Sequence, residues 1–336
     1  MAINSFPTII HLKDPNPPPN ARTYIIFFIT GNPGLISYYT TFLQHLYSVL
    51  STSSSSKDIT FQVYGASLSG FDVHGKEQGF VAGKAPPYGL LDQIEGVSNA
   101  LRGLVTRERK GSGGDEAPRV VLMGHSVSLT ASRRTFNPWI RGLKLTSRGP
   151  PLQRQPSLLI VGGVCLTPTV VDIARSSSGR ISSVLLPIPG YVLIASLVVR
   201  FLTFWIPLRI FEALVHVVTG FPADAAAVTA AFIKSRWGVK QALHMAREEM
   251  QVITADTWDD EIWGAAALSP SGLPRSKLFF LFAKQDHWVA DETRDDLIRL
   301  RARRGTGKKR HSVPVAEKVK GYIDEIVEAD LATSTR

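Results

Sequence analysis

The residues in this chain that most clearly suggest chemistry form a short turn after a β-rich run. Arg119 to Met123, RVVLM, is followed by Gly124, His125 and Ser126. A glycine two residues before a serine, directly after a buried strand, is typical of a nucleophile elbow, in which a strained turn exposes the serine Oγ at the carboxyl end of a sheet. Gly124 and His125 would form the elbow, with Ser126 as the candidate nucleophile. The pattern's second glycine is replaced by Ser128, which is small enough to fit.

A second loop has the composition of an oxyanion hole. Gly31, Asn32, Pro33 and Gly34 directly follow the first apolar run. In hydrolases with such an elbow, one oxyanion N–H comes from the residue after the nucleophile, here Val127, and another from an early strand-to-helix loop. Plain turns remain the alternative for both motifs, because Gly-x-Ser is a common pattern and Asn-Pro and Pro-Gly are ordinary turn dipeptides.

Strands alternating with helices must position these two loops. Continuous apolar runs predict strands, and apolar residues at helical spacing predict helices. The strands are expected over 24–30, 61–66, 119–123, 158–164 and 277–282, and the helices over 38–50, 88–106 and 315–327. This alternation indicates an α/β fold with a mostly parallel central sheet flanked by helices.

Composition excludes several classes of protein. With 44% hydrophobic and 20% charged residues over 336 positions, the chain is not of the disordered class. The single cysteine, Cys165, excludes a disulfide framework and a multi-cysteine metal site, so we expect no metal and a reducing compartment. The N-terminus lacks a basic segment followed by an apolar one, so we expect no secretory signal and a protein on the cytosolic side.

The net charge of +10 is concentrated in two stretches, 128–157 and 297–311. Together they hold 13 basic residues and no acidic one, so the rest of the chain is slightly acidic. No aromatic ladder, zinc knuckle or helix-turn-helix pattern accompanies them, and we do not expect nucleic-acid binding.

Several motifs in fixed order resemble one family. They are GNPGLISYY, SGFD, YGLLDQIE, GHSV, GGVCLTPTVVDIARSSSGR, EEM, DTWDDEIWG and FAKQDHWVADETRD. In combination they are similar to the lipid-droplet-associated hydrolases, in a fungal-type form. The resemblance implies an α/β-hydrolase fold over 20–330, a Ser-Asp-His triad, no metal or organic cofactor, and association with the surface of lipid droplets.

The resemblance assigns Asp286, in the turn QDHW after an apolar run, as the acid that orients the base. Its alternative is a structural turn aspartate. The family's catalytic histidine lies in a loop reading roughly G-I-P-H-x-F, which this chain lacks. His311 is the only later histidine after His287 and precedes the closing helix, so it is a candidate base. HSVPVAEKV also resembles the segment that follows the family's histidine, which would make His311 a non-catalytic neighbour.

The two basic stretches replace family segments beside catalytic positions. We expect them to be disordered or to arise from errors in exon assignment: a retained intron after Val127 and a lost or misread exon before His311. Transcript sequencing across both junctions decides between these origins.

An apolar insert spans about 180–221, and its segment Val184–Val199 has no charged residue. A membrane-spanning helix needs roughly 20 apolar residues, and Pro187, Pro189 and Arg200 interrupt this one. We expect a hairpin or lid in a lipid monolayer. A buried cap over the active site is the alternative. The expected lipid-contacting residues are Leu185, Leu186, Tyr191, Leu193, Phe201, Phe204 and Trp205.

Taken together, these features predict a serine ester hydrolase that acts on neutral-lipid esters at lipid droplets, on their cytosolic side, with the endoplasmic reticulum membrane as a second location. The alternative, favoured by the absent histidine loop, is a catalytically impaired droplet-binding protein that keeps the fold.

Overall fold

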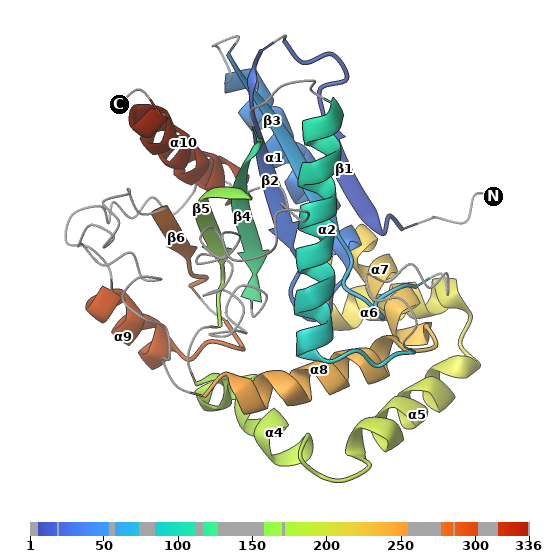
Figure 1. The fold of residues 1–336 in the computed structure, drawn as a ribbon. Helices are drawn as coiled ribbons and strands as arrows, with labels where there is room; N and C mark the ends of the chain where they lie inside the picture. The colour runs from blue at the N-terminus through green and yellow to red at the C-terminus, as the bar shows by residue number, and fades with distance from the viewer. Residues whose placement is uncertain are drawn as a thin grey trace, which may run out of the picture.

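The computed structural model describes residues 6–18, 20–53, 58–73, 85–111, 117–126, 158–169, 172–254, 277–284, 286–301 and 315–334. Among these residues, six strands form one sheet in the order β1-β3-β2-β4-β5-β6 (Figure 1). The strands are β1 (Ile9–Lys13), β2 (Arg22–Ile29), β3 (Ile59–Ala66), β4 (Arg119–His125), β5 (Leu159–Leu166) and β6 (Lys277–Leu281). All pairs are parallel except β1 with β3. The predicted α/β arrangement is therefore confirmed.

Helices cover both faces of this sheet because the buried strands are apolar on both sides. Along β2, Ile25, Phe27 and Ile29 join the core under α2 (Leu90–Gly111). The alternate residues Tyr24, Ile26 and Phe28 pack on the other face, under α1 (Thr40–Ser53) and α10 (Val315–Ser334). A strand buried on both faces reads as a continuous apolar run, which is why YIIFFI predicted this position.

A group of helices lies across the carboxyl ends of the parallel strands (Figure 1). It comprises α4 (Ser177–Leu185), α5 (Tyr191–Phe204), α6 (Leu208–Thr219), α7 (Ala223–Lys234) and α8 (Gly238–Val252). A short 3-10 helix, η1 (Ile36–Tyr39), precedes α1, and η5 (Ile173–Arg175) precedes α4. The insert at 180–221 thus comprises most of α4 together with α5 and α6.

The structure describes only part of the two basic stretches. Residues 128–157 lie outside the described residues, and so do 302–311. Leu297 to Arg301, which we included in the second stretch, form the end of α9 (Asp291–Arg301), where Leu297 is buried in the core beneath α2.

Candidate active site

Ser126 has the backbone conformation that a nucleophile elbow requires. It follows β4 directly, with a φ of 58°. The left-handed region is costly for a residue with a side chain, and such strain gathers at functional sites. Pairing of Gly124 with Ile29 and Cys165 holds the end of β4 between β2 and β5. The sheet therefore fixes Ser126 at its carboxyl edge.

The Gly31–Gly34 loop lies directly against this elbow. A β-carbon placed on Gly31 would come within 2.8 Å of His125 Nδ1 and 3.1 Å of Ser126 Cβ. A β-carbon on Gly34 would stand 2.6 Å from Leu68 Cβ. Glycine at position 31 lets the backbone of the loop approach the serine, as an oxyanion hole needs, and glycine at position 34 lets the loop pack against Leu68.

Tyr39 links the elbow to the same loop. Its hydroxyl lies 3.1 Å from His125 Nδ1. Burial raises the pKa of Tyr39, and a hydrogen bond with the Gly31 backbone acts in the opposite direction. Tyr39 stands in the motif GNPGLISYY, but nothing in the sequence alone assigned it a contact with the elbow.

Asp286 lies near the elbow in the turn after β6. Burial lowers the pKa of His125, and the charge of Asp286 raises it, so the carboxylate acts on the residue next to Ser126. The Asp286 Oδ1 accepts a hydrogen bond from Trp288 N at 2.7 Å. The next carbonyl, His287 O, accepts hydrogen bonds from Ser178 N at 3.0 Å and Ser177 Oγ at 3.2 Å. The start of α4 thereby holds the turn that carries the candidate acid.

Two predicted site residues, Val127 and His311, lie outside the described residues. The structure thus brings together the candidate nucleophile, the Gly31–Gly34 loop and the candidate acid. Among the described residues, no group of three or more His, Cys, Asp or Glu side chains is placed to hold a metal ion.

Hydrogen bonds attach helix α8 to the loops around the elbow. Gln241 exchanges two hydrogen bonds with the Tyr88 backbone, at 2.7 and 2.8 Å. Glu248 Oε2 accepts from Leu90 N at 2.5 Å, at the start of α2. The Nδ2 of Asn32 donates to Ala242 O at 3.0 Å. One helix therefore holds both the Gly31–Gly34 loop and the start of α2.

Glu249, on the same helix, is an unusually buried carboxyl group, with 4% of its surface exposed. Burial raises its pKa to about 7, while a hydrogen bond with Asn32 lowers it and the charge of Glu248 raises it. Its motif, EEM, resembles the family, but nothing in the sequence distinguishes a buried glutamate from an exposed neighbour or gives Glu249 a role.

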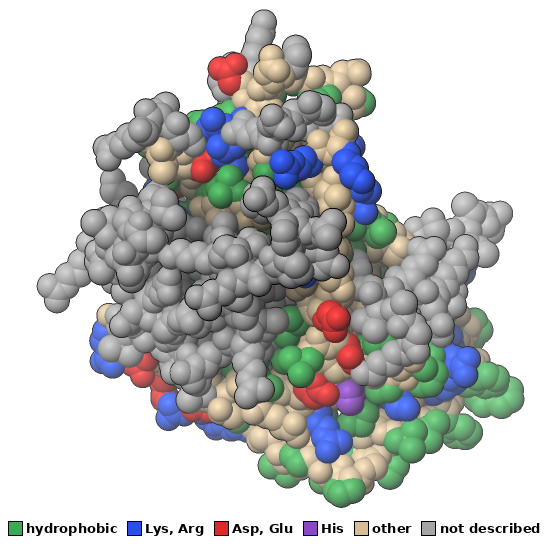
Figure 2. Space-filling model, in the orientation of Figure 1, with side chains coloured by type: hydrophobic (Ala, Val, Ile, Leu, Met, Phe, Trp, Pro, Cys, Tyr) green, Lys and Arg blue, Asp and Glu red, His purple; other side chains and the backbone are tan. Residues whose placement is uncertain are grey.

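Apolar side chains of the insert are exposed in large number. We call the exposed large hydrophobic residues of α4 to α6 and their connections the apolar cap face. They are Ile181, Val184, Ile188, Leu193, Ile194, Leu197, Val198, Phe201, Leu202, Phe204, Trp205, Leu208, Ile210, Leu214, Val217, Val218 and Phe221. Figure 2 shows hydrophobic side chains gathered at the lower right, over α5.

The predicted lipid-contacting residues fall into two groups. Leu193, Phe201, Phe204 and Trp205 belong to the apolar cap face, with Trp205 78% exposed. Leu185 and Tyr191 are half-buried. Leu186, at 3% exposure, packs inside and does not contribute to this face.

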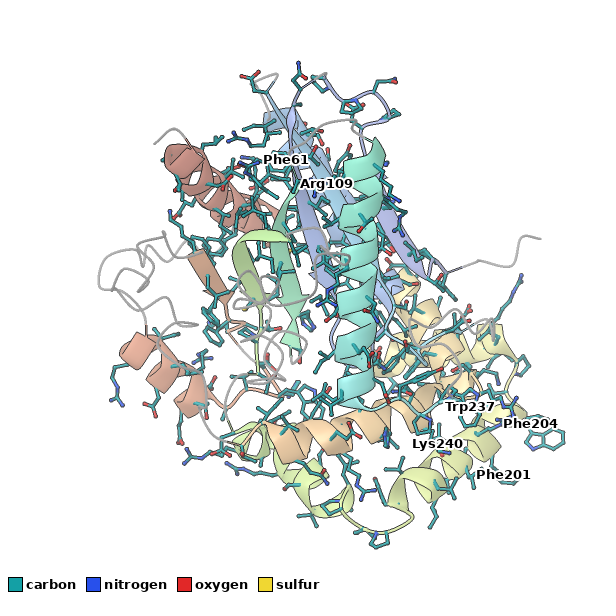
Figure 3. The ribbon with its side chains drawn as sticks, viewed as in Figure 1. Phe61, Arg109, Phe201, Phe204, Trp237 and Lys240 are labelled. Atoms are coloured by element: carbon teal, nitrogen blue, oxygen red, sulfur yellow. The ribbon has the colours of Figure 1, made fainter. Side chains whose placement is uncertain are left out.

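Cationic and aromatic residues flank the apolar cap face. The side chains of Trp237 and Lys240 project at the start of α8, toward the end of α5 that carries Phe201 and Phe204 (Figure 3). Lys240 Nζ lies 5.2 Å from the centre of the Trp237 ring, and α5 packs against α8. Rings and cations beside an apolar surface are typical of a boundary between oil and water.

None of the described helices is alone long and apolar enough to cross a membrane. Helices α5 and α6 together reach the required length and composition, but they are bent by 115° at the break between them.

Comparison with known proteins identifies one family. A family profile described as lipid-droplet associated hydrolase matches residues 22–320. Over 181 residues, the chain is 26% identical to the lipid droplet-associated hydrolase of Rattus norvegicus, covering 52% of this chain and 46% of that protein. Over 177 residues it is 27% identical to the Homo sapiens protein of the same name, covering 50% and 45%. The chain thus spans about half the length of the curated relatives it matches.

The solved structures that match this chain have low TM-scores. MenH from S. aureus has a TM-score of 0.39 at 9% identity, covering 96% of this chain and 98% of its own. An α/β hydrolase from Sphaerobacter thermophilus has a TM-score of 0.32 at 14% identity, covering 86% and 94%. No functional conclusion rests on scores this low. The family match and the sheet topology together confirm the expected α/β-hydrolase fold.

Proposed function

The chain belongs to the lipid-droplet associated hydrolase family, and from that membership we propose that it is a serine hydrolase cleaving carboxylic esters of neutral lipids at the droplet surface. The observation that carries this proposal is the positive φ of Ser126 with Gly31 packed against it. A strained serine beside a glycine loop is the arrangement that acyl transfer uses.

In the proposed mechanism, Ser126 Oγ attacks the ester carbonyl as its proton passes to the base. The ester C–O bond then breaks, the alcohol leaves with that proton, and water hydrolyses the acyl-enzyme to release the fatty acid and restore the serine. Backbone N–H groups of Val127 and of the Gly31–Gly34 loop stabilise the charge that develops on the carbonyl oxygen. Asp286 holds and charge-stabilises the imidazole that takes the serine proton, for which His311 is the candidate. No metal or organic cofactor takes part in these steps.

We propose that the apolar cap face rests on the lipid monolayer of a droplet, on its cytosolic side, with the endoplasmic reticulum membrane as a second location. Each large apolar side chain contributes about 1.5–3 kcal/mol when fully removed from water, so burial of a few suffices for binding. Arg200 and Arg209, both exposed, lie on α5 and α6 and can extend to the headgroups. The position of the cap helices supports this proposal, because they lie across the carboxyl ends of the parallel strands, the end at which β4 leads into Ser126 (Figure 1).

The second candidate is a droplet-binding protein of the same fold with impaired catalysis. The feature favouring it is the absence of the family's G-I-P-H loop from the sequence. It shares the apolar cap face with the first candidate and differs only in the reactivity of Ser126.

One experiment separates the two candidates. The full chain is purified with droplets from oleate-loaded cells and treated with a fluorophosphonate probe, which labels activated serines. Labelling that is lost in Ser126→Ala, together with release of fatty acid from a triacylglycerol emulsion, supports the enzyme. Droplet association without labelling supports the impaired binding protein, and a chain that does not associate with droplets contradicts both.

A further inference from the structure

The cap carries an excess of positive charge. Residues 180–240 hold six basic and two acidic side chains: Arg180, Arg200, Arg209, Lys234, Arg236 and Lys240, against Glu212 and Asp224. Three of the basic groups, on Arg200, Arg236 and Lys240, form no salt bridge within the part of the chain that the structure describes. These charges are therefore available to a partner of opposite sign.

Lys234 ties the basic segment that follows it to the apolar cap face. Its Nζ donates hydrogen bonds to Ile206 O at 2.8 Å and to Thr203 O, at the end of α5. The same atom lies 5.9 Å from the centre of the Phe211 ring on α6. One side chain at the end of α7 thus joins both sides of the break between α5 and α6, and it holds the start of α8 nearby.

Two positive charges share one aromatic ring just after Lys234. Arg236 Cζ lies 5.1 Å and Lys240 Nζ 5.2 Å from the centre of the Trp237 ring. The ring attracts each cation, but like charges at this spacing repel each other. Lys240, in the first turn of α8, also opposes the helix dipole. A bound anion would offset both unfavourable effects.

Exposed rings lie beside these charges. Phe204 and Trp205, both exposed, end α5 with their ring centroids 5.1 Å apart. Trp237 and Lys240 project toward this end of α5 (Figure 3). Arg200 precedes Phe204 by about one helical turn, so the two share one side of α5. Apolar rings next to unpaired cations suit a lipid whose headgroup carries a net negative charge.

We propose that the end of α5 and the start of α8 form a site for an anionic phospholipid of the droplet monolayer. Arg200, Arg236 and Lys240 surround its phosphate, and Phe204 and Trp205 enter its acyl chains. This inference deepens the proposed function and rests on it, because it assumes that the apolar cap face meets the monolayer. A net negative charge on the lipid adds about fivefold in affinity for each basic residue near the surface.

Flotation of the full chain with artificial droplets tests this site. Triolein droplets are coated either with phosphatidylcholine alone or with phosphatidylcholine and phosphatidylinositol. The wild type is expected to bind the second kind at least tenfold more tightly, and high salt should reduce that advantage by screening the charges. Equal binding to both kinds overturns this proposal and leaves the proposed function standing. A chain that floats with neither kind contradicts the proposed function, and this proposal with it.

The double variant Arg236→Gln with Lys240→Gln tests whether the cluster creates the preference. Its affinity for phosphatidylinositol droplets is expected to fall about 25-fold, with little change on phosphatidylcholine alone. Arg236→Lys with Lys240→Arg keeps both charges and should behave as the wild type. The matched control, Arg102→Gln with Lys318→Gln, removes two exposed charges from α2 and α10 and should keep the preference.

Melting temperatures confirm that each variant is folded. If the double variant does not fold, Arg236→Gln alone, at an exposed position, is expected to lose about fivefold. Equal losses in the cluster variant and the matched control, or no loss in either, overturn the proposal.

A last measurement separates a lipid headgroup from a free anion. Inorganic phosphate is added to phosphatidylinositol droplets and compared with sodium chloride at the same ionic strength. Both salts are expected to release the same fraction of the chain, because the acyl chains hold the lipid in the site as well as its charge does. A greater release by inorganic phosphate would show a site for free phosphate and overturn the phospholipid as its occupant.

Discussion

Gly31 lies so close to Ser126 that a β-carbon on the glycine would stand 3.1 Å from the Cβ of the serine. The two residues come from loops that follow adjacent parallel strands, β2 and β4. The two loops lie far apart in the sequence, and the pairing of β2 with β4 in the sheet brings them together. The proposed oxyanion hole is therefore sensitive to any added atom at position 31.

Gly31→Ala is the most direct test of that approach. The new methyl group would collide with His125 Nδ1 and press on Ser126, so we expect kcat on an ester emulsion to fall about 100-fold, comparable to loss of an oxyanion donor. Gly321→Ala in α10 is the matched control, because a β-carbon there would meet nothing within 4 Å. The control should keep its activity and gain roughly 0.5–1 kcal/mol of stability. Equal activity in both variants would remove the loop from the mechanism.

Ser126→Ala should abolish fluorophosphonate labelling and lower esterase turnover by several orders of magnitude, because the members of a triad act as a unit. Droplet targeting should persist, since the apolar cap face is untouched. Ser51→Ala, at an exposed position of α1, serves as the control and should behave as the wild type. Labelling is read on a gel and targeting by fluorescence microscopy. Undiminished turnover in Ser126→Ala would exclude this serine as the nucleophile.

The stability of the folded chain should depend on pH through Glu249. Its pKa is raised to about 7 from an ordinary value of 4.5. Between these values the folded state holds a proton that the unfolded state has lost. The free energy of unfolding therefore decreases as pH rises from about 4.5 to 7, by on the order of 3 kcal/mol. Below that window the carboxyl group is neutral in both states, so it makes no pH-dependent contribution to the free energy of unfolding.

Glu249→Gln removes this titration and supplies the control. The melting temperature of the variant relative to wild type should rise as the pH increases from 5 to 8, as measured by differential scanning fluorimetry. A constant difference between the two proteins over that range would mean that Glu249 titrates normally in the fold.

The apolar cap face should govern binding to droplets. The pair Phe201→Glu and Val217→Glu places two charges on side chains that are 71% and 78% exposed, so folding should be preserved while burial in lipid becomes unfavourable. We expect co-flotation with artificial droplets of triolein and phosphatidylcholine to fall at least tenfold, on the basis of the lost transfer energy. Val315→Glu, which adds a charge at a 52% exposed position of α10, is the control. Undiminished flotation of the double variant would move the lipid-binding surface to another part of the chain.

The sequence predicted the elements whose burial is continuous and missed those whose burial is partial. Strand β2 was visible because every residue from Tyr24 to Ile29 is buried. Strand β1 was not, because Ile10 is its only buried residue and its antiparallel pairing with β3 leaves Ile9 exposed. An edge strand of this kind carries little signal in its own sequence.

The site shows the same division. Ser126 and Gly31 could be proposed from the sequence because local backbone geometry demands particular residue types at those positions. The contact of Tyr39 with His125 joins residues 86 positions apart. Glu249 forms a hydrogen bond with Asn32, which is further away still in the sequence. Such relationships arise from packing between elements, which a single sequence does not encode in any local pattern.

His287 O accepts hydrogen bonds from Ser177 and Ser178. These two bonds affect what a deletion of the insert can demonstrate. These two serines begin α4, which continues into the insert, and the carbonyl they hold belongs to the residue after Asp286. Excising 180–221 would shorten that helix to its first few residues and withdraw support from the acid's turn. A truncated protein that lost both droplet staining and esterase turnover would therefore not demonstrate that catalysis requires lipid. Point substitutions on the outer surface keep the two activities separable.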